Sequence, residues 1–183
     1  MAVRIKATTF RSYVAILAGD GKRAAVMANV PPDTAALMRD PPLAGSWMDG
    51  RHVHDVLVAV DQIGGTGAVR DLARRATEDA RRPYMSIVEG VLKLFGTSPA
   101  TLFKRMNTLV SSILEGVDFR YTPSGDRGGV MDVTWSVDYM MPMCEFASLM
   151  PTFQALLESC GAKGSVGMPE RVAPSRARYR IQW

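Results

Sequence analysis

The chain holds few of the residue types that usually carry out catalysis: two histidines, His52 and His54, and two cysteines, Cys144 and Cys160. Histidines two positions apart on a helix point roughly 200° apart, so they cannot both bind one metal ion, and no metal site is predicted. Either could be a lone haem ligand, but no motif supports haem, and the cofactor stays unknown. We expect a surface histidine beside Asp55 and two buried free thiols.

No arrangement of residues indicates a catalytic site. The sequence contains no Gly-x-Ser-x-Gly nucleophile elbow, and its carboxylates are scattered singly, so no acid–base pair can be assigned. The glycine-rich segment 64–67 lacks the Gly-Lys-Ser/Thr of a phosphate loop, and we expect it to end a helix instead. No catalytic residue is predicted. Whether the protein is an enzyme stays open, and the sequence favours a protein without enzymatic activity.

Methionine is the one unusual component of the composition. The chain has 12 methionines, and several lie close to Trp135 in the sequence. Methionine fills irregular gaps in cores and also lines adaptable apolar pockets, so both interpretations stay open. If a pocket lies between helices and sheet, we expect five side chains to form its hydrophobic walls. These are Trp135, Tyr139, Met141, Cys144 and Phe146.

The charge balance is mildly basic, with a net charge of +4. The densest group of arginines is interspersed with acidic residues, a pattern typical of a solvated helix face with ion pairs at i,i+3 and i,i+4. The alternative is a face that binds nucleic acid or a scaffold, although surfaces that bind nucleic acid usually carry positive charge alone. The arginines in question are Arg70, Arg74, Arg75, Arg81 and Arg82.

The elements that must position these residues are best defined between Pro83 and Val137. We predict a helix from Pro83 that buries one apolar face and ends at Gly96, and a second helix from Ser98-Pro99 to Glu115, closed by Gly116. After Gly116 the apolar residues recur every second position instead of every 3.6 positions. This alternation predicts a hairpin with strands around 119–121 and 131–137. The buried positions of the first helix are Ile87, Val88, Val91, Leu92 and Phe95.

The flanking segments complete an α+β fold. A short strand at 3–6 and several proline-punctuated helices indicate a helical N-terminal lobe at 1–82. After the hairpin we predict a helix interrupted at Pro151, a strand at 166–168 and a regular terminal strand at 176–183 that is paired inside the sheet. The prediction is a single domain in which the lobe 83–183 packs helices on a small antiparallel sheet.

The composition is ordinary for a globular protein, with 47% hydrophobic and 22% charged residues. No apolar run approaches the roughly 18 residues of a membrane helix, and the start of the chain lacks a signal-peptide pattern. We therefore expect a cytoplasmic protein with no membrane partner.

Several segments together resemble a known family. They are Ser46-Trp47, Ser98-Pro99, Glu115-Gly116, the run 156–163 (LLESCGAK) and the closing run 179–183 (YRIQW). The chain resembles a myxobacterial paralogous family of uncharacterised proteins, which is distantly similar to the haem-NO-binding and 4-vinyl-reductase group of ligand-binding domains. The resemblance implies a helical N-terminal lobe followed by helices on an antiparallel sheet. The Tyr-x-Ser-x-Arg motif and the cysteine-rich ending of that group are absent here, so neither haem nor zinc is carried over.

The sequence thus favours a non-catalytic small-molecule-binding or regulatory module with an apolar pocket between helices and sheet. Its partner would be a small apolar ligand or another protein, and we expect a homodimer. The alternatives are an enzyme that acts on a small hydrophobic substrate, and a nucleic-acid- or scaffold-binding protein that uses the basic face.

Overall fold

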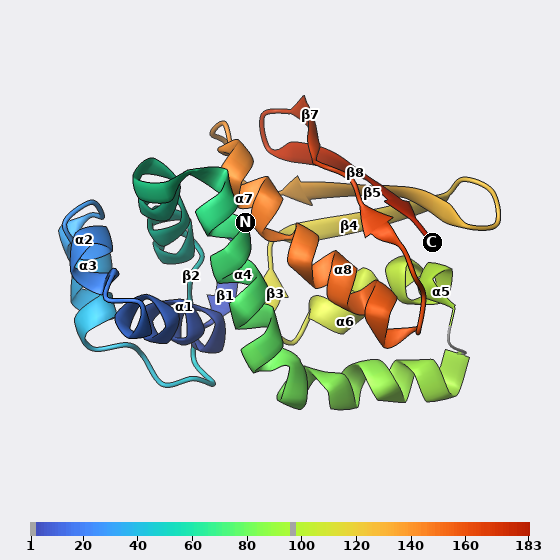
Figure 1. Cartoon of the computed structure of the whole chain (residues 1–183), viewed down its shortest axis with the longest axis horizontal. Coiled ribbons are helices and arrows are strands. Elements are labelled where there is room, and N and C mark those ends of the chain that lie inside the picture. Colours follow the sequence, from blue (N-terminus) through green and yellow to red (C-terminus); the bar gives the residue numbers. More distant parts are fainter. Residues whose placement is uncertain (1–2, 96–97) are drawn as a thin grey trace.

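A group of helices and an antiparallel sheet lie side by side in the computed structural model, joined by the long helical segment 51–95 (Figure 1). The structure describes residues 3–95 and 98–183, with side chains for 3–79 and 98–183. Helices and antiparallel strands are segregated along the chain, so the predicted α+β class is confirmed. No helix in the described part is long and apolar enough to cross a bilayer.

The N-terminal part consists of short helices around two short strands. The predicted strand at the start is confirmed, and a second strand, which the sequence analysis did not predict, pairs with it antiparallel. These elements are β1 (Arg4–Lys6), α1 (Ala7–Gly19), α2 (Arg23–Met27), α3 (Pro32–Arg39) and β2 (Trp47–Asp49).

The segment α4 (Arg51–Phe95) consists of two helices that meet at Gly65, where the backbone is not helical (Figure 1). The predicted end of a helix at the glycine-rich segment 64–67 is therefore confirmed. Gly65 has φ 72°, which glycine adopts without steric cost. Pro83 starts no new helix, because α4 runs through it. The predicted burial along 87–95 concerns side chains outside the described ones, and Gly96 also lies outside the described residues.

The predicted helix from Pro99 to Glu115 is wrong in its second half. Pro99 does begin a helix, α5 (Pro99–Lys104), but a break separates it from α6 (Met106–Val110), and the chain then becomes strand β3 (Leu114–Glu115). Two serines after Val110 favour a turn, and β1 offers strand partners, since Ile5 pairs with Leu114. The helical spacing of apolar residues continues to Leu114, but there the pairing with β1 makes the chain a strand.

The predicted hairpin and terminal strand are confirmed. β4 (Val117–Pro123) pairs antiparallel with β5 (Gly128–Trp135), which pairs in turn with β8 (Arg176–Gln182). The far edge of β8 is covered by β6 (Ser165–Val166) and by β7 (Glu170–Ala173), a strand that the sequence analysis missed. Alternation places Ala177, Tyr179 and Ile181 in the core.

Two helices cover the sheet, α7 (Met143–Ser148) and α8 (Met150–Ser159), and they separate just before Pro151, where the interruption was predicted. The buried side chains form two groups. The C-terminal core lies between sheet, α5 and α8 and includes Phe103, Phe153 and Tyr179. The N-terminal core lies between α1 and the first half of α4 and includes Phe10 and Tyr13.

Candidate functional site

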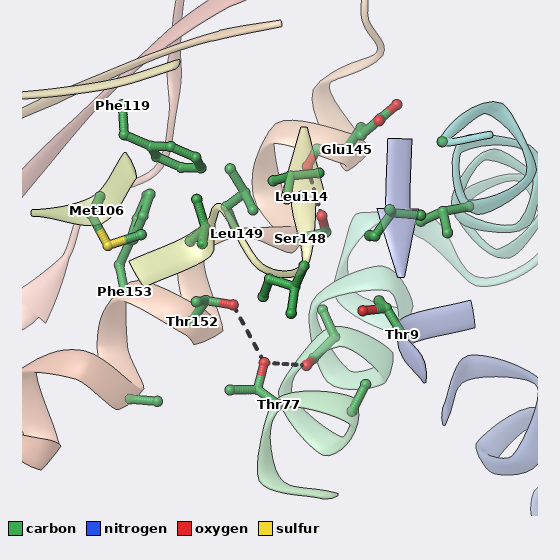
Figure 2. Close-up of a pocket in the computed structure, with 18 of the residues that line it drawn as sticks. Thr9, Thr77, Met106, Leu114, Phe119, Glu145, Ser148, Leu149, Thr152 and Phe153 are labelled. Atoms are coloured by element: carbon green, nitrogen blue, oxygen red, sulfur yellow. Dashed lines mark hydrogen bonds between the residues drawn. The ribbon is translucent and has the colours of Figure 1, made fainter. Parts of the chain in front are cut away.

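A cavity of about 250 Å³ lies between the two cores. We call it the interlobe cavity. One side is formed by β1, α1 and α4, and the other by α6, β3, the sheet and the helices α7 and α8 (Figure 2). Both lobes therefore contribute to its wall, and neither lobe encloses it alone.

Small side chains on α4 leave the space for this cavity. Ala73, Ala76 and Thr77 stand at i, i+3 and i+4, so they share one face of the helix. Opposite them, α8 presents Thr152 and Phe153. An alanine face against a helix that carries larger residues does not fill the gap, because neither alanine reaches beyond its Cβ.

Most polar groups in the wall are engaged within the protein. Thr77 Oγ1 donates to the carbonyl oxygen of Ala73 at 2.8 Å and lies 3.4 Å from Thr152 Oγ1, which links α4 to α8 (Figure 2). Ser148 Oγ donates to the carbonyl oxygen of Glu145 at 2.7 Å. Such internal pairing leaves a wall that is mostly apolar toward the cavity.

Two hydroxyls on α1 are exceptions among these polar groups: that of the partly buried Thr9 and that of the buried Tyr13. The Tyr13 side chain lines the cavity from α1 and the residue is only 6% exposed, yet its hydroxyl has no hydrogen-bond partner among the described residues. Burial raises the pKa of Tyr13 well above its usual value, and the nearby charge of Glu145 raises it further. The hydroxyl therefore keeps its proton and is available as a donor.

Glu145 and His54 form a polar contact between the lobes beside the cavity. His54 Nδ1, on α4, lies 2.5 Å from Glu145 Oε2, on α7. The hydrogen bond to this carboxylate raises the pKa of His54 above 6.5, against the opposing effect of burial. The other histidine, His52, is buried and bonds Thr34 Oγ1 at 2.7 Å through Nδ1.

These contacts correct the expectation of a surface histidine beside Asp55. Both rings lie in the protein interior or at its edge, and Asp55 accepts a hydrogen bond from Thr34 Oγ1 at 2.6 Å. The predicted divergence of the two rings is confirmed, since His52 and His54 contact different elements. Neither histidine and neither cysteine of the chain lines the interlobe cavity.

Of the five residues predicted as pocket walls, Trp135 lines the cavity. Met141 and Phe146 are fully buried in the C-terminal core, and Tyr139 is 42% exposed with its ring 5.5 Å from that of His54. Cys144 packs in the N-terminal core. Burial raises the pKa of the Cys144 thiol to about 11, so it stays protonated and is not a nucleophile.

The predicted basic face carries ion pairs where the structure describes it. Arg74 pairs with Asp71 at 2.6 Å and with Glu78 at 2.7 Å. Arg75 pairs with Asp20 at 2.7 Å, and Arg70 contacts the sulfur of Met168. The side chains of Arg81 and Arg82 lie outside the described ones.

No family model and no curated protein matches this sequence. Solved structures do match it in shape. An Fe(II) unliganded H-NOX protein from K. algicida aligns with a TM-score of 0.71 over 97% of this chain and 96% of its own, at 7% identity. The fold is that of H-NOX domains. An oxygen-binding H-NOX domain related to soluble guanylate cyclases aligns with a TM-score of 0.62 over 97% of this chain and 94% of its own, at 13% identity.

A further H-NOX structure, from work on haem distortion in the family, aligns with a TM-score of 0.65 over 98% of this chain and 95% of its own, at 14% identity. The H-NOX-like fold thus extends over both lobes. The sequence analysis missed the residues that make the cavity, Tyr13, Ala73 and Ala76. The i, i+3 spacing of the two alanines was the available signal, but it does not indicate what faces them.

Proposed function

We propose that this chain is a non-catalytic small-molecule-binding or regulatory module that holds a small apolar ligand, and not haem, in the interlobe cavity. The observation that carries the proposal is the cavity itself: about 250 Å³, bounded by both lobes and mostly apolar. Ligand sites in proteins are concave and apolar with a few placed polar groups, which is the character of this wall. The H-NOX-like fold, found in proteins that bind haem and oxygen, supports a ligand-binding role.

The wall, as far as its described residues show, does not fit haem, first because they offer no suitable axial ligand. Haem iron is held in proteins by His, Cys, Met or Tyr, with Met acting alongside His in cytochromes. Neither histidine and neither cysteine reaches the cavity. Met106 and Tyr13 do line it, but Met106 has no histidine to act beside, and the raised pKa of Tyr13 opposes the phenolate that would bind iron.

Charge and size oppose haem as well. Haem carries two propionates, and the described wall contains no Arg or Lys to pair with them, whereas its one charged residue, Glu145, has the same sign as a propionate. An engineered apolar cavity of about 150 Å³ holds a single benzene, so about 250 Å³ suits one or two rings rather than a four-ring macrocycle. We derive no function through haem.

The finer parts of the proposal rest on the sequence. They are a single domain with lobes 1–82 and 83–183, a cytoplasmic location, a homodimer, and kinship with the myxobacterial paralogous family. The H-NOX-like fold is compatible with each of them and decides none. Of the predicted pocket residues, we propose Trp135 as the direct ligand contact and the other four as its supports.

The test is binding of isopropylbenzene, a neutral one-ring probe, to the full chain. At a free concentration ten times its Kd, a probe that binds only the folded state stabilises it by about 1.4 kcal/mol, which raises Tm by roughly 3–6 °C in a chain of this size. Haemin added under the same conditions should give no Soret band of bound haem.

A pair of variants assigns the binding to the cavity. Ala76→Leu adds three carbons to the cavity wall and should abolish the isopropylbenzene response, whereas Ala15→Leu adds the same atoms to the exposed side of α1 and should leave it intact. A Soret band with tight haemin binding, or an equal probe response in both variants, would contradict the proposal.

A further inference from the structure

Tyr13 gives the interlobe cavity its most buried hydroxyl without a described partner, beside the partly buried Thr9 one turn earlier on α1. Buried hydroxyls are almost always hydrogen-bonded, because an unpaired polar group removed from water costs free energy. The Tyr13 hydroxyl has no such bond to the described residues; Tyr13 is 6% exposed and lines the cavity, and its oxygen is not among the fully enclosed unpaired atoms, so it borders open space. By comparison, the hydroxyl of Tyr179, in the C-terminal core, donates to the carbonyl oxygen of Phe146 at 2.7 Å.

The surroundings of Tyr13 fix which partner it can take. Its raised pKa means that the hydroxyl carries its proton, so it has an O–H to donate, and an acceptor in the cavity would pair with it. An anionic acceptor is disfavoured, since Glu145 lies in the same wall and no described Arg, Lys or His faces the cavity. A cationic ligand gains little either, because His54 already pairs with the Glu145 carboxylate.

We propose that the interlobe cavity binds an uncharged molecule of one or two rings that carries a single hydrogen-bond acceptor, such as a ketone oxygen, and that Tyr13 donates to this acceptor. The inference rests on the proposed function and adds the ligand class and the residue that selects it. The apolar body of the ligand would lie against Leu114, Trp135 and Phe153, which line the same space.

Three probes of nearly equal size separate the elements of this proposal. Isopropylbenzene has no acceptor, acetophenone has a neutral acceptor and benzoate has an anionic one. Each is titrated calorimetrically into the full chain and into Tyr13→Phe, which removes only the hydroxyl. The comparison is made between proteins for each probe, so differences in hydration among the probes cancel.

We expect Tyr13→Phe to weaken acetophenone binding about 2- to 10-fold, the ordinary range for one neutral hydrogen bond, and to leave isopropylbenzene binding unchanged. Benzoate should bind the wild-type chain more weakly than acetophenone. In the wild-type complex the carbonyl stretch of acetophenone should shift to lower frequency, and Tyr13→Phe should reverse the shift. The infrared measurement on the wild-type chain tests the proposal even if the variant does not fold.

The outcomes distinguish the two levels of the argument. If both neutral probes bind and Tyr13→Phe affects them equally, or if the bound carbonyl shows no shift, the ligand class is wrong while the apolar cavity site stands. Tighter binding of benzoate than of acetophenone would also overturn the ligand class. If neither neutral probe binds, the proposed function itself fails.

Discussion

Two buried tyrosines show how differently the two cores are built. Tyr179 is fully buried in the C-terminal core, where its ring packs 5.1 Å from that of Phe153 and its hydroxyl is bonded to Phe146. Tyr13 is nearly as buried in the N-terminal core, but its hydroxyl lacks a described partner and its side chain lines an open space. The same residue type completes the packing in one core and leaves it incomplete in the other.

The difference extends beyond the tyrosines. The C-terminal core is filled by aromatic rings in mutual contact, with Phe103 stacked 5.6 Å from Tyr121 and 6.2 Å from Trp183. The boundary with the N-terminal lobe is instead lined by aliphatic side chains with alanines and threonines among them. Close packing stabilises a fold, whereas a gap of about 250 Å³ lowers stability unless something fills it. The closely packed sheet core therefore contributes most to stability, and the gap at the boundary between the lobes is the place where a ligand would bind.

The largest expected effect is in the sheet core. Phe103→Ala should destabilise the protein by about 3–5 kcal/mol, because Phe103 is 1% exposed and contacts three other aromatic rings. Urea unfolding followed by circular dichroism measures the change. Ala76→Leu, which fills space at the boundary, should cost far less or even stabilise. If Phe103→Ala cost less than Ala76→Leu, the division between the two regions would be wrong.

The paired tyrosine variants test the comparison directly. Tyr179→Phe should cost about 0.5–1.5 kcal/mol, since it removes the hydrogen bond to the carbonyl oxygen of Phe146. Tyr13→Phe should change the free energy of unfolding by less than about 0.5 kcal/mol, because its hydroxyl has no described partner to lose. Both are measured by urea unfolding without any probe. Equal losses in the two variants would show that Tyr13 also has a structural bond.

The smallest effect concerns the contact between the lobes. The folded-state pKa of His54 is raised, so its contribution to stability is fully present below pH 6.5 and is lost as the pH rises through the folded-state value. His54→Gln should therefore lower Tm at the acid end of this range and have no effect well above it, with a difference below about 1 kcal/mol. Glu145→Gln should show the same pH dependence. A penalty independent of pH would mean that the ring acts by packing alone.

The sequence predicted best the parts of the fold whose periodicity is local. The alternation of β8 needs no distant partner to be recognised, and its pairing with β5 follows from it. The stretch after Val110 shows the limit. Its apolar spacing continues a helix, but β1 supplies a strand partner more than a hundred residues away in the sequence, and that pairing decides the outcome.

The candidate site could be predicted only in its general character. The sequence contains enough apolar helix and strand faces to suggest an apolar pocket between helices and sheet. However, the apolar spacing around most of the wall residues indicates only ordinary core packing. Tyr13 is one position in a regular helical stripe of α1. The sequence around Tyr13 does not show whether its hydroxyl will find a hydrogen-bond partner, as that of Tyr179 does. The answer depends on which residues of the other lobe lie opposite it.

The course of α4 places two contacts on separate helices. Its two helices meet at Gly65, between Leu57 and the alanine face, and residues from both border the N-terminal core. A ligand against Ala76 would contact the second of these helices, whereas His54 lies on the first, on the other side of Gly65. The glycine thus separates the helix that borders the bound molecule from the helix that carries the histidine contact to α7.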